Sequence, residues 1–227
     1  MKKKVFYTEL AYIIGLCSLA LSAALMEKAD FGVSMVVAPA YLIHLKVSQY
    51  LPFFSFGMAE YTLQAFLLII MVMVLRKFKL SYLFSFVTAV LYGFILDFSI
   101  YSVSLIPFDG IVARIALYIL GLLGCAVGVS LLFHTYISPE VYELFVKEVS
   151  SKLNVNINKF KTIYDISSCI IAIIMSFVFF GWFNFEGVKI GTIVCALLNG
   201  FTIGMFSRLF EKLFQLEDRF SLRKHFE

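Results

Sequence analysis

Long runs of apolar residues separated by short polar stretches set the pattern of this chain. Each run is close to the 20 or so residues that an α-helix needs to cross the hydrocarbon core of a bilayer. Prolines and glycines fall between several of the runs and mark the breaks. The pattern therefore predicts an all-α membrane protein with six transmembrane helices, at Tyr7–Met26, Phe56–Leu75, Ser81–Ser102, Val112–Phe133, Ile163–Trp182 and Val188–Phe210.

The apolar pattern recurs about halfway along the chain. Residues 11–16 (AYIIGL) align with 117–122 (LYILGL) at an offset of 106, and residues 89–94 (AVLYGF) align with 196–201 (ALLNGF) at 107. Each copy holds three spans, and an odd number of crossings makes the second copy enter the membrane from the opposite face. We therefore expect two inverted three-helix repeats with short helical connectors, residues 1–105 and 111–215, and a cytoplasmic basic tail at 216–227.

Two connectors are longer than a turn and occupy equivalent places in the two copies. The outer one, Glu27–Ser55, includes an apolar stretch with Pro39 that is too short to span, and we expect it to dip into the bilayer or pack under the bundle. In the inner one, His134–Thr162, apolar residues recur at helical spacing after Pro139 with charges between them. This indicates an amphipathic interfacial helix, with a plain surface helix as the alternative.

Composition and charge agree with a membrane protein and orient it. Hydrophobic residues make up 61% of the chain and charged residues 15%, against roughly 25% charged residues in soluble domains. With the N-terminus inside, 15 of the 19 Lys and Arg residues lie in the inner loops and tails. The positive-inside rule then predicts a multi-pass protein of the bacterial cell (inner) membrane with both termini cytoplasmic. Basic residues confined to short loops and tails do not indicate a nucleic-acid partner.

Charged and polar groups inside the spans are the candidates for a substrate or ion site, because they are costly in the membrane. Glu60 and Asp97 have similar expected depths near the outer side, so they could share an outward-facing cavity. Gln64 lies one helical turn from Glu60 on the same face, with Tyr61 nearby. The alternative is that both acids are interfacial residues that reach water, or that one carboxyl is neutral.

A second set of candidates lies in the second copy. Asp165, next to Tyr164, matches the place of Glu60 in the first copy, although an acid at a helix start is also favoured by the helix dipole. Asn199 places a polar group deep in the sixth span, where it could hydrogen-bond to a neighbouring helix or contact a ligand. Gly121, Gly124 and Gly128 mark one face of the fourth span, which predicts close helix packing, with a substrate path as the alternative.

Motifs for enzymatic chemistry are missing from the sequence. It has no metalloprotease, nucleophile-elbow, P-loop or dinucleotide signature, so we expect no enzyme, no cofactor and no metal site. The four cysteines lie within apolar spans and suggest neither a disulfide nor a metal site. The chain is therefore expected to be a small-solute transporter or permease-like protein. The alternative is an accessory protein that docks a membrane or cytoplasmic partner through 138–152 and the tail, and a homodimer stays open.

Three short segments together are similar to a known type of membrane protein. They are residues 27–33 (EKADFGV), residues 162–165 (TIYD), and Gly191-Thr192-Ile193 before Gly200. With these segments the chain resembles the bacterial YczE/YitT-type integral membrane proteins over nearly its whole length. The glycine step that often follows the first span in such proteins is here Gly32-Val33-Ser34. The resemblance implies a multi-pass topology and no catalytic residue.

Overall fold

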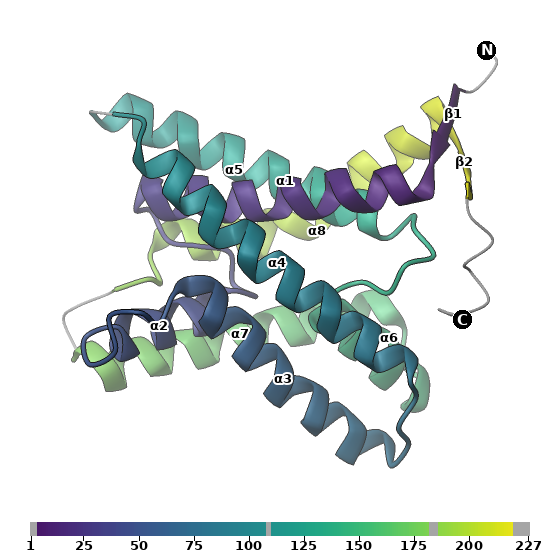
Figure 1. The fold of residues 1–227 in the computed structure, drawn as a ribbon, viewed down its shortest axis with the longest axis horizontal. Helices are drawn as coiled ribbons and strands as arrows, with labels where there is room; N and C mark the ends of the chain where they lie inside the picture. The colour runs from purple at the N-terminus through teal and green to yellow at the C-terminus, as the bar shows by residue number, and fades with distance from the viewer. Residues whose placement is uncertain (1–3, 108–109, 182–185, 220–227) are drawn as a thin grey trace.

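The computed structural model describes residues 4–107, 110–181 and 186–219. This part of the chain is helical except for two short terminal strands (Figure 1). Six of its eight helices are long and apolar enough to cross a membrane. The elements are β1 (Lys4–Tyr7), α1 (Thr8–Ala29), α2 (Ala38–Val47), α3 (Phe56–Leu75), α4 (Ser81–Ser104), α5 (Ile111–Leu132), α6 (Val141–Lys152), α7 (Ile157–Phe180), α8 (Ile190–Leu213) and β2 (Phe214–Glu217).

The six long helices confirm the predicted spans and make this a multi-pass membrane protein. Their bounds lie within a few residues of the predicted ones. The largest shift is in α7, which begins at Ile157 rather than Ile163, while its predicted end at Trp182 lies outside the described residues. Large apolar side chains, such as Phe94, Phe98 and Phe201, are exposed on the helix surfaces, as expected where lipid replaces water.

The terminal strands were not expected from the sequence. β1 pairs in parallel with β2, with Lys4 opposite Phe214 and Tyr7 opposite Glu217. The pair holds the start of α1 beside the end of α8, so both ends of the described chain lie at the same end of the bundle (Figure 1). The expected basic tail thus begins in a strand, and its residues 220–227 lie outside the described part of the chain.

Helices α1 and α5 cross at their small residues. A Cβ on Gly128 would lie 2.8 Å from the carbonyl oxygen of Gly15, and one on Gly121 would lie 2.9 Å from that of Ser22. Between these two contacts, the hydroxyl of Ser18 donates to the carbonyl of Gly124 at 2.9 Å. Backbones can approach this closely only where side chains are small. The glycine face of α5 is therefore a packing face, as predicted.

Helix α6 lies inside the bundle, and the prediction of an interfacial helix is wrong. Its first N–H, on Val141, donates to the side chain of Gln64 in the first half of α3 at 3.0 Å. Near its other end, the ammonium of Lys152 donates to the carbonyl of Val74, close to the end of α3. The connector after α5 therefore runs back into the bundle, and α6 returns alongside α3. Its buried apolar residues fill the space between α3, α4 and α7.

Helix α2 is placed in the same way against α7. The carbonyl of Met35, just before α2, accepts from the hydroxyl of Ser168 near the middle of α7 at 2.9 Å. At the other end of α2, the ammonium of Lys46 donates to the carbonyl of Phe179 near the end of α7. The outer connector thus packs within the bundle, one of the two arrangements expected. Irregular backbone at membrane depth is tolerated only when it is buried in protein or lines a cavity.

Candidate functional site

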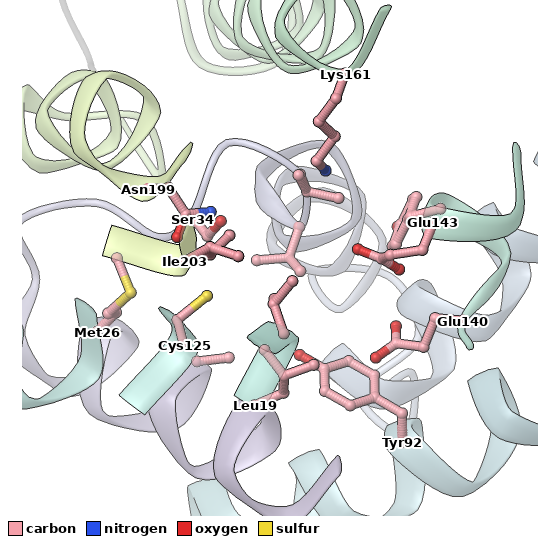
Figure 2. Close-up of a pocket in the computed structure, with 15 residues that line it drawn as sticks. Leu19, Met26, Ser34, Tyr92, Cys125, Glu140, Glu143, Lys161, Asn199 and Ile203 are labelled. Carbon is pink, nitrogen blue, oxygen red and sulfur yellow. The ribbon is translucent and has the colours of Figure 1, made fainter. Parts of the chain in front are cut away.

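A small, largely buried cavity lies between the segment that precedes α2 and the start of α6 (Figure 2). Its volume is about 50 Å³, and its lining comes from five long helices, from the residues just before α2 and from the start of α6. Tyr92 and Asn199, which line it, sit near the middle of α4 and α8. The cavity is therefore at the centre of the six spans, far from either end of the bundle.

The start of α6 is held by α3 through buried side chains. Besides accepting from Val141, the amide of Gln64 donates to a carboxylate oxygen of Glu140 at 2.9 Å. One turn earlier on α3, Glu60 accepts from the hydroxyl of Tyr142 at 3.0 Å. Glu60 and Gln64 are fully buried, and their place on one face of α3, as predicted, lets both contact α6. The other oxygen of Glu60 has no hydrogen-bond partner within the described chain.

Three charged side chains line the cavity. Glu140 is the N-cap residue of α6, Glu143 lies in its first turn, and Lys161 reaches in from α7 (Figure 2). Lys161 forms an ion pair with Asp165 one turn along α7, at 2.9 Å. Burial raises the pKa of Glu140 well above its usual range, and the neighbouring Glu143 and Glu60 add to the shift. Burial also raises the pKa of Glu143, against the opposing attraction of Lys161.

Uncharged polar groups complete the lining. Asn199 is only 4% exposed, and its side-chain oxygen has no hydrogen-bond partner within the described residues. Tyr92 is 2% exposed, and Ser34, before α2, also contributes to the wall. A buried amide oxygen without a partner carries a free-energy cost of about 1–3 kcal/mol. A molecule in the cavity would remove that cost by donating to Asn199 or coordinating it.

Glu143 and Lys161 also line a second, larger space. This cleft of about 380 Å³ lies between the end of α5, α6 and the start of α7, with Pro139 and Lys147 among its lining residues. Because both side chains face the cleft as well as the cavity, they form the partition between the two. The cavity is therefore separated by one layer of charged side chains from the end of the bundle that carries the chain termini.

Asp97 and Tyr61 occupy the contact between α3 and α4. Asp97 accepts from the N–H of Gly57 at 2.8 Å and from the hydroxyl of Ser55 at 2.5 Å. It thus caps the start of α3, where N–H groups lack helical partners. Tyr61 packs beside Gly93 at the same crossing. Asp97 therefore bonds to the start of α3, whereas its expected partner Glu60 bonds to α6.

Asp165 and Tyr164, expected to mirror Glu60, lie beside the cavity and not in its lining. Asp165 is connected to the cavity through its ion pair with Lys161, whose side chain lines the cavity. The Tyr164 ring packs against Phe145 of α6, with centroids 5.7 Å apart. Of the residues proposed from the sequence, Asn199 lines the cavity directly, while Glu60 and Gln64 hold the segment that supplies its acids.

The sequence analysis missed Glu140, Glu143 and Lys161 as site residues. The sequence pattern assigns the two acids to an amphipathic interfacial helix or, as the alternative, to a surface helix, and Lys161 is one of the 15 inner cations. One signal was available. The inner connector occupies the place in its copy that the apolar outer connector occupies in the other, so a buried position for one argued for a buried position for both.

Comparisons with other proteins place the chain in a family. Neither the curated proteins nor the solved structures contain a match to it. The model of the family of unknown function DUF6198 matches residues 6–208, which include all six spans up to the last turn of α8. The chain therefore belongs to the family of unknown function DUF6198.

Proposed function

We propose that this protein is a secondary transporter and that the central cavity is where its small polar solute is enclosed. The observation that carries the proposal is the placement of Glu140, Glu143 and Lys161 around a small buried space at the middle of six apolar helices. A charged side chain at the bilayer centre costs roughly 2.5–3.5 kcal/mol on insertion scales, and such residues commonly mark substrate or ion pathways. No enzymatic step is part of the proposal.

The packing of the helices supports an inverted repeat. At the offset of 106, Gly15 corresponds to Gly121, and Ser22 corresponds to Gly128. The contact of Gly15 with Gly128 therefore corresponds to the contact of Gly121 with Ser22, and the contact between Ser18 and Gly124 corresponds to itself. A two-fold axis through Ser18 and Gly124 would produce this pattern. In the same way, α2 packs on α7 while α6 packs on α3. Transporters with inverted repeats bind substrate at the repeat interface, beside broken helices, and open alternately to each side.

The orientation follows from charge and from the terminal strands. The excess of Lys and Arg in the inner loops and tails favours cytoplasmic termini, and the β1–β2 pair keeps both termini on one side. We assign the protein to the bacterial inner membrane, in keeping with its resemblance to the YczE/YitT-type proteins. The cleft beside Glu143 and Lys161 would then open to the cytoplasm.

The alternative role as an accessory protein requires a docking surface. Of the two segments expected to provide it, residues 138–152 are largely buried, and the tail lies mostly outside the described residues. Within α6, Val141, Tyr142, Leu144, Val146 and Val149 are buried against the neighbouring helices. The side chains of α6 that reach solvent, such as Lys147, are scattered among these buried positions. An internal polar cavity also has no evident use in a protein that only docks a partner. Both points favour transport.

A metabolite comparison tests the proposal. Cells that express the protein and cells that lack it are compared by untargeted mass spectrometry of the cell interior and the medium. We expect at least one small polar solute to change its distribution. Asn199→Leu, which removes the polar atoms from the cavity wall, should abolish the difference. Thr202→Val, on the same helix and bonded only to its own backbone, should keep it. Identical profiles of metabolites and of inorganic ions with and without the protein would refute a transport role.

A further inference from the structure

The volume of the central cavity limits what it can enclose. A site for a drug-sized organic molecule occupies roughly 300–1,000 Å³, whereas one water molecule takes about 30 Å³ of liquid. The cavity measures about 50 Å³. In this arrangement it can hold one or two particles of the size of water, such as a single ion, and no ordinary metabolite.

The chemistry of the walls favours a cation over an anion. Helix starts usually attract anions through free N–H groups, but here several of those groups are engaged or missing. The N–H groups of Val37 and Ala38 donate to Ser34, Pro39 has none, and that of Val141 donates to Gln64. The N-cap residue Glu140 and Glu143 in the first turn of α6 are acids, which offset the positive end of that helix.

Oxygen atoms with free capacity face the cavity instead. The carboxylates of Glu140 and Glu143 project into it, with the unpartnered amide oxygen of Asn199 and the hydroxyl of Tyr92 also in the wall (Figure 2). Lys161 is paired with Asp165, so that pair adds no net charge. Neither cavity glutamate has a Lys or Arg nitrogen within ion-pair distance among the described residues. The site therefore has an excess of negative charge.

We propose that this cavity binds a small monovalent cation in exchange for a proton held by the Glu140–Glu143 carboxyl pair. The inference rests on the transporter function proposed above and names its substrate class. When the cation enters, one carboxyl releases its proton to water, so the charge of the site stays constant. When the cation leaves, the carboxyl takes a proton back. Across a membrane, this exchange is cation–proton antiport.

The groups that face the pair support a proton in the empty site. Glu60 on α3, Tyr92 on α4, Tyr12 on α1 and the Lys161–Asp165 pair on α7 surround the two acids. Lys161, held by Asp165, favours the ionised carboxylates, as do the hydrogen bonds from Gln64 to Glu140 and from the backbone to Glu143. Burial acts in the opposite direction and is the larger effect for both acids. Gln64 donates to one oxygen of Glu140, which leaves the other oxygen for the proton. The raised pKa of Glu140 is the expected consequence.

The route of exchange is the cleft between α5, α6 and α7. Glu143 and Lys161 line both the cavity and this cleft, so movement of these two side chains alone would connect the cavity to one end of the bundle. Toward the opposite end, Asp30 at the end of α1 accepts from Arg114 and Lys189, which ties α1, α5 and the start of α8 together. The structure is thus closer to opening on the side of α6.

Proton release on cation binding tests the proposal without requiring transport. The purified protein in detergent and weak buffer receives NaCl or KCl, with choline chloride at equal ionic strength as the reference. The wild type should release about one proton per bound cation, and its apparent Kd should rise roughly tenfold for each pH unit below the titration of the site. Glu140→Gln should release none. Glu148→Gln, the same change on the same helix but bonded to Lys79 and Tyr82 at the surface, should behave as the wild type.

Three results would overturn the proposal. They are equal proton release with choline, unchanged release from Glu140→Gln, and a response to Mg²⁺ in place of Na⁺ and K⁺. If Glu140→Gln does not elute as a single species, Glu143→Gln takes its place under the same criteria. Proteoliposomes with an internal pH dye separate this inference from the transport function. Cation binding with proton release but without cation-driven flux would support the cation site and refute transport. A metabolite difference without any effect of cations would support transport and refute the cation site.

Discussion

Replacing Glu140 with glutamine should change how the stability of the protein depends on pH. Glu140 is 4% exposed, and burial is the main cause of its raised pKa. In the unfolded chain this carboxyl ionises near its ordinary pKa of 4.5, but the folded protein keeps the proton to higher pH. Between the two pKa values the unfolded state binds fewer protons than the folded state. The stability of the wild type therefore falls as the pH rises. The contribution of the protonated Glu140 to the free energy of unfolding is complete only below pH 4.5.

The size of the effect follows from linkage. Within that window the free energy of unfolding falls by about 1.4 kcal/mol for each pH unit, which for a chain of this length corresponds to roughly 3–6 °C in Tm. Glu140→Gln cannot ionise, and its amide can still accept the hydrogen bond from Gln64. The Tm of the variant minus that of the wild type should therefore increase with pH. Other titrating groups are common to both proteins and cancel in the difference.

Thermal unfolding in detergent from pH 5 to pH 9 measures this difference. Glu148→Gln is the matched control and should keep the pH dependence of the wild type, because it leaves the cavity intact. Parallel Tm profiles for the wild type and Glu140→Gln would show that Glu140 ionises alike in the folded and unfolded states. The assignment of a buried, proton-holding carboxyl at the centre of the bundle would then fail.

Three further variants test other parts of the structure. Gly57→Ala should destabilise the protein by about 1–3 kcal/mol or more, because its Cβ would lie 2.1 Å from the carbonyl oxygen of Gly93. Gly200→Ala is the control and should not destabilise the protein, because its Cβ would meet nothing within 4 Å. Equal Tm values for the two variants would contradict the α3–α4 crossing. Asp97→Asn should lower stability by about 1 kcal/mol through its weakened cap on α3, and a loss of transport at unchanged Tm would instead place Asp97 in the transport site. A cysteine at position 79 should react with an impermeant maleimide in permeabilised cells and not in intact ones, and the opposite pattern would reverse the proposed topology.

The spans and their number could be read from the sequence because the membrane imposes a local rule. A helix that crosses lipid must be apolar for about 20 residues regardless of what it packs against, so the six predicted and observed spans agree within a few residues. The glycine face of α5 could be predicted from the sequence for a similar reason. Close approach of two backbones requires small residues at fixed helical spacing, and Gly121, Gly124 and Gly128 have that spacing.

Only part of the candidate site could be predicted from the sequence. Asn199 was identified because a polar residue in the middle of an apolar span stands out, and Glu60 with Gln64 for the same reason. Glu140 and Glu143 lie in a connector, where charges are ordinary. Their amphipathic spacing fits a surface helix and a buried helix equally well, since periodicity identifies a face and not the environment that this face meets.

The sequence by itself determined which segments enter the membrane, because that depends on the free energy of transfer of each segment alone. The tertiary structure decided where the two connectors go. α6 is buried because Gln64, Glu60 and Thr88 provide partners for Val141, Tyr142 and the carbonyl of Ser138, and those partners lie 50–82 residues away in the chain. The charged cavity exists only where the segment before α2 and the start of α6 meet. Such a meeting depends on contacts between segments that lie far apart in the chain, which no local pattern of residues describes.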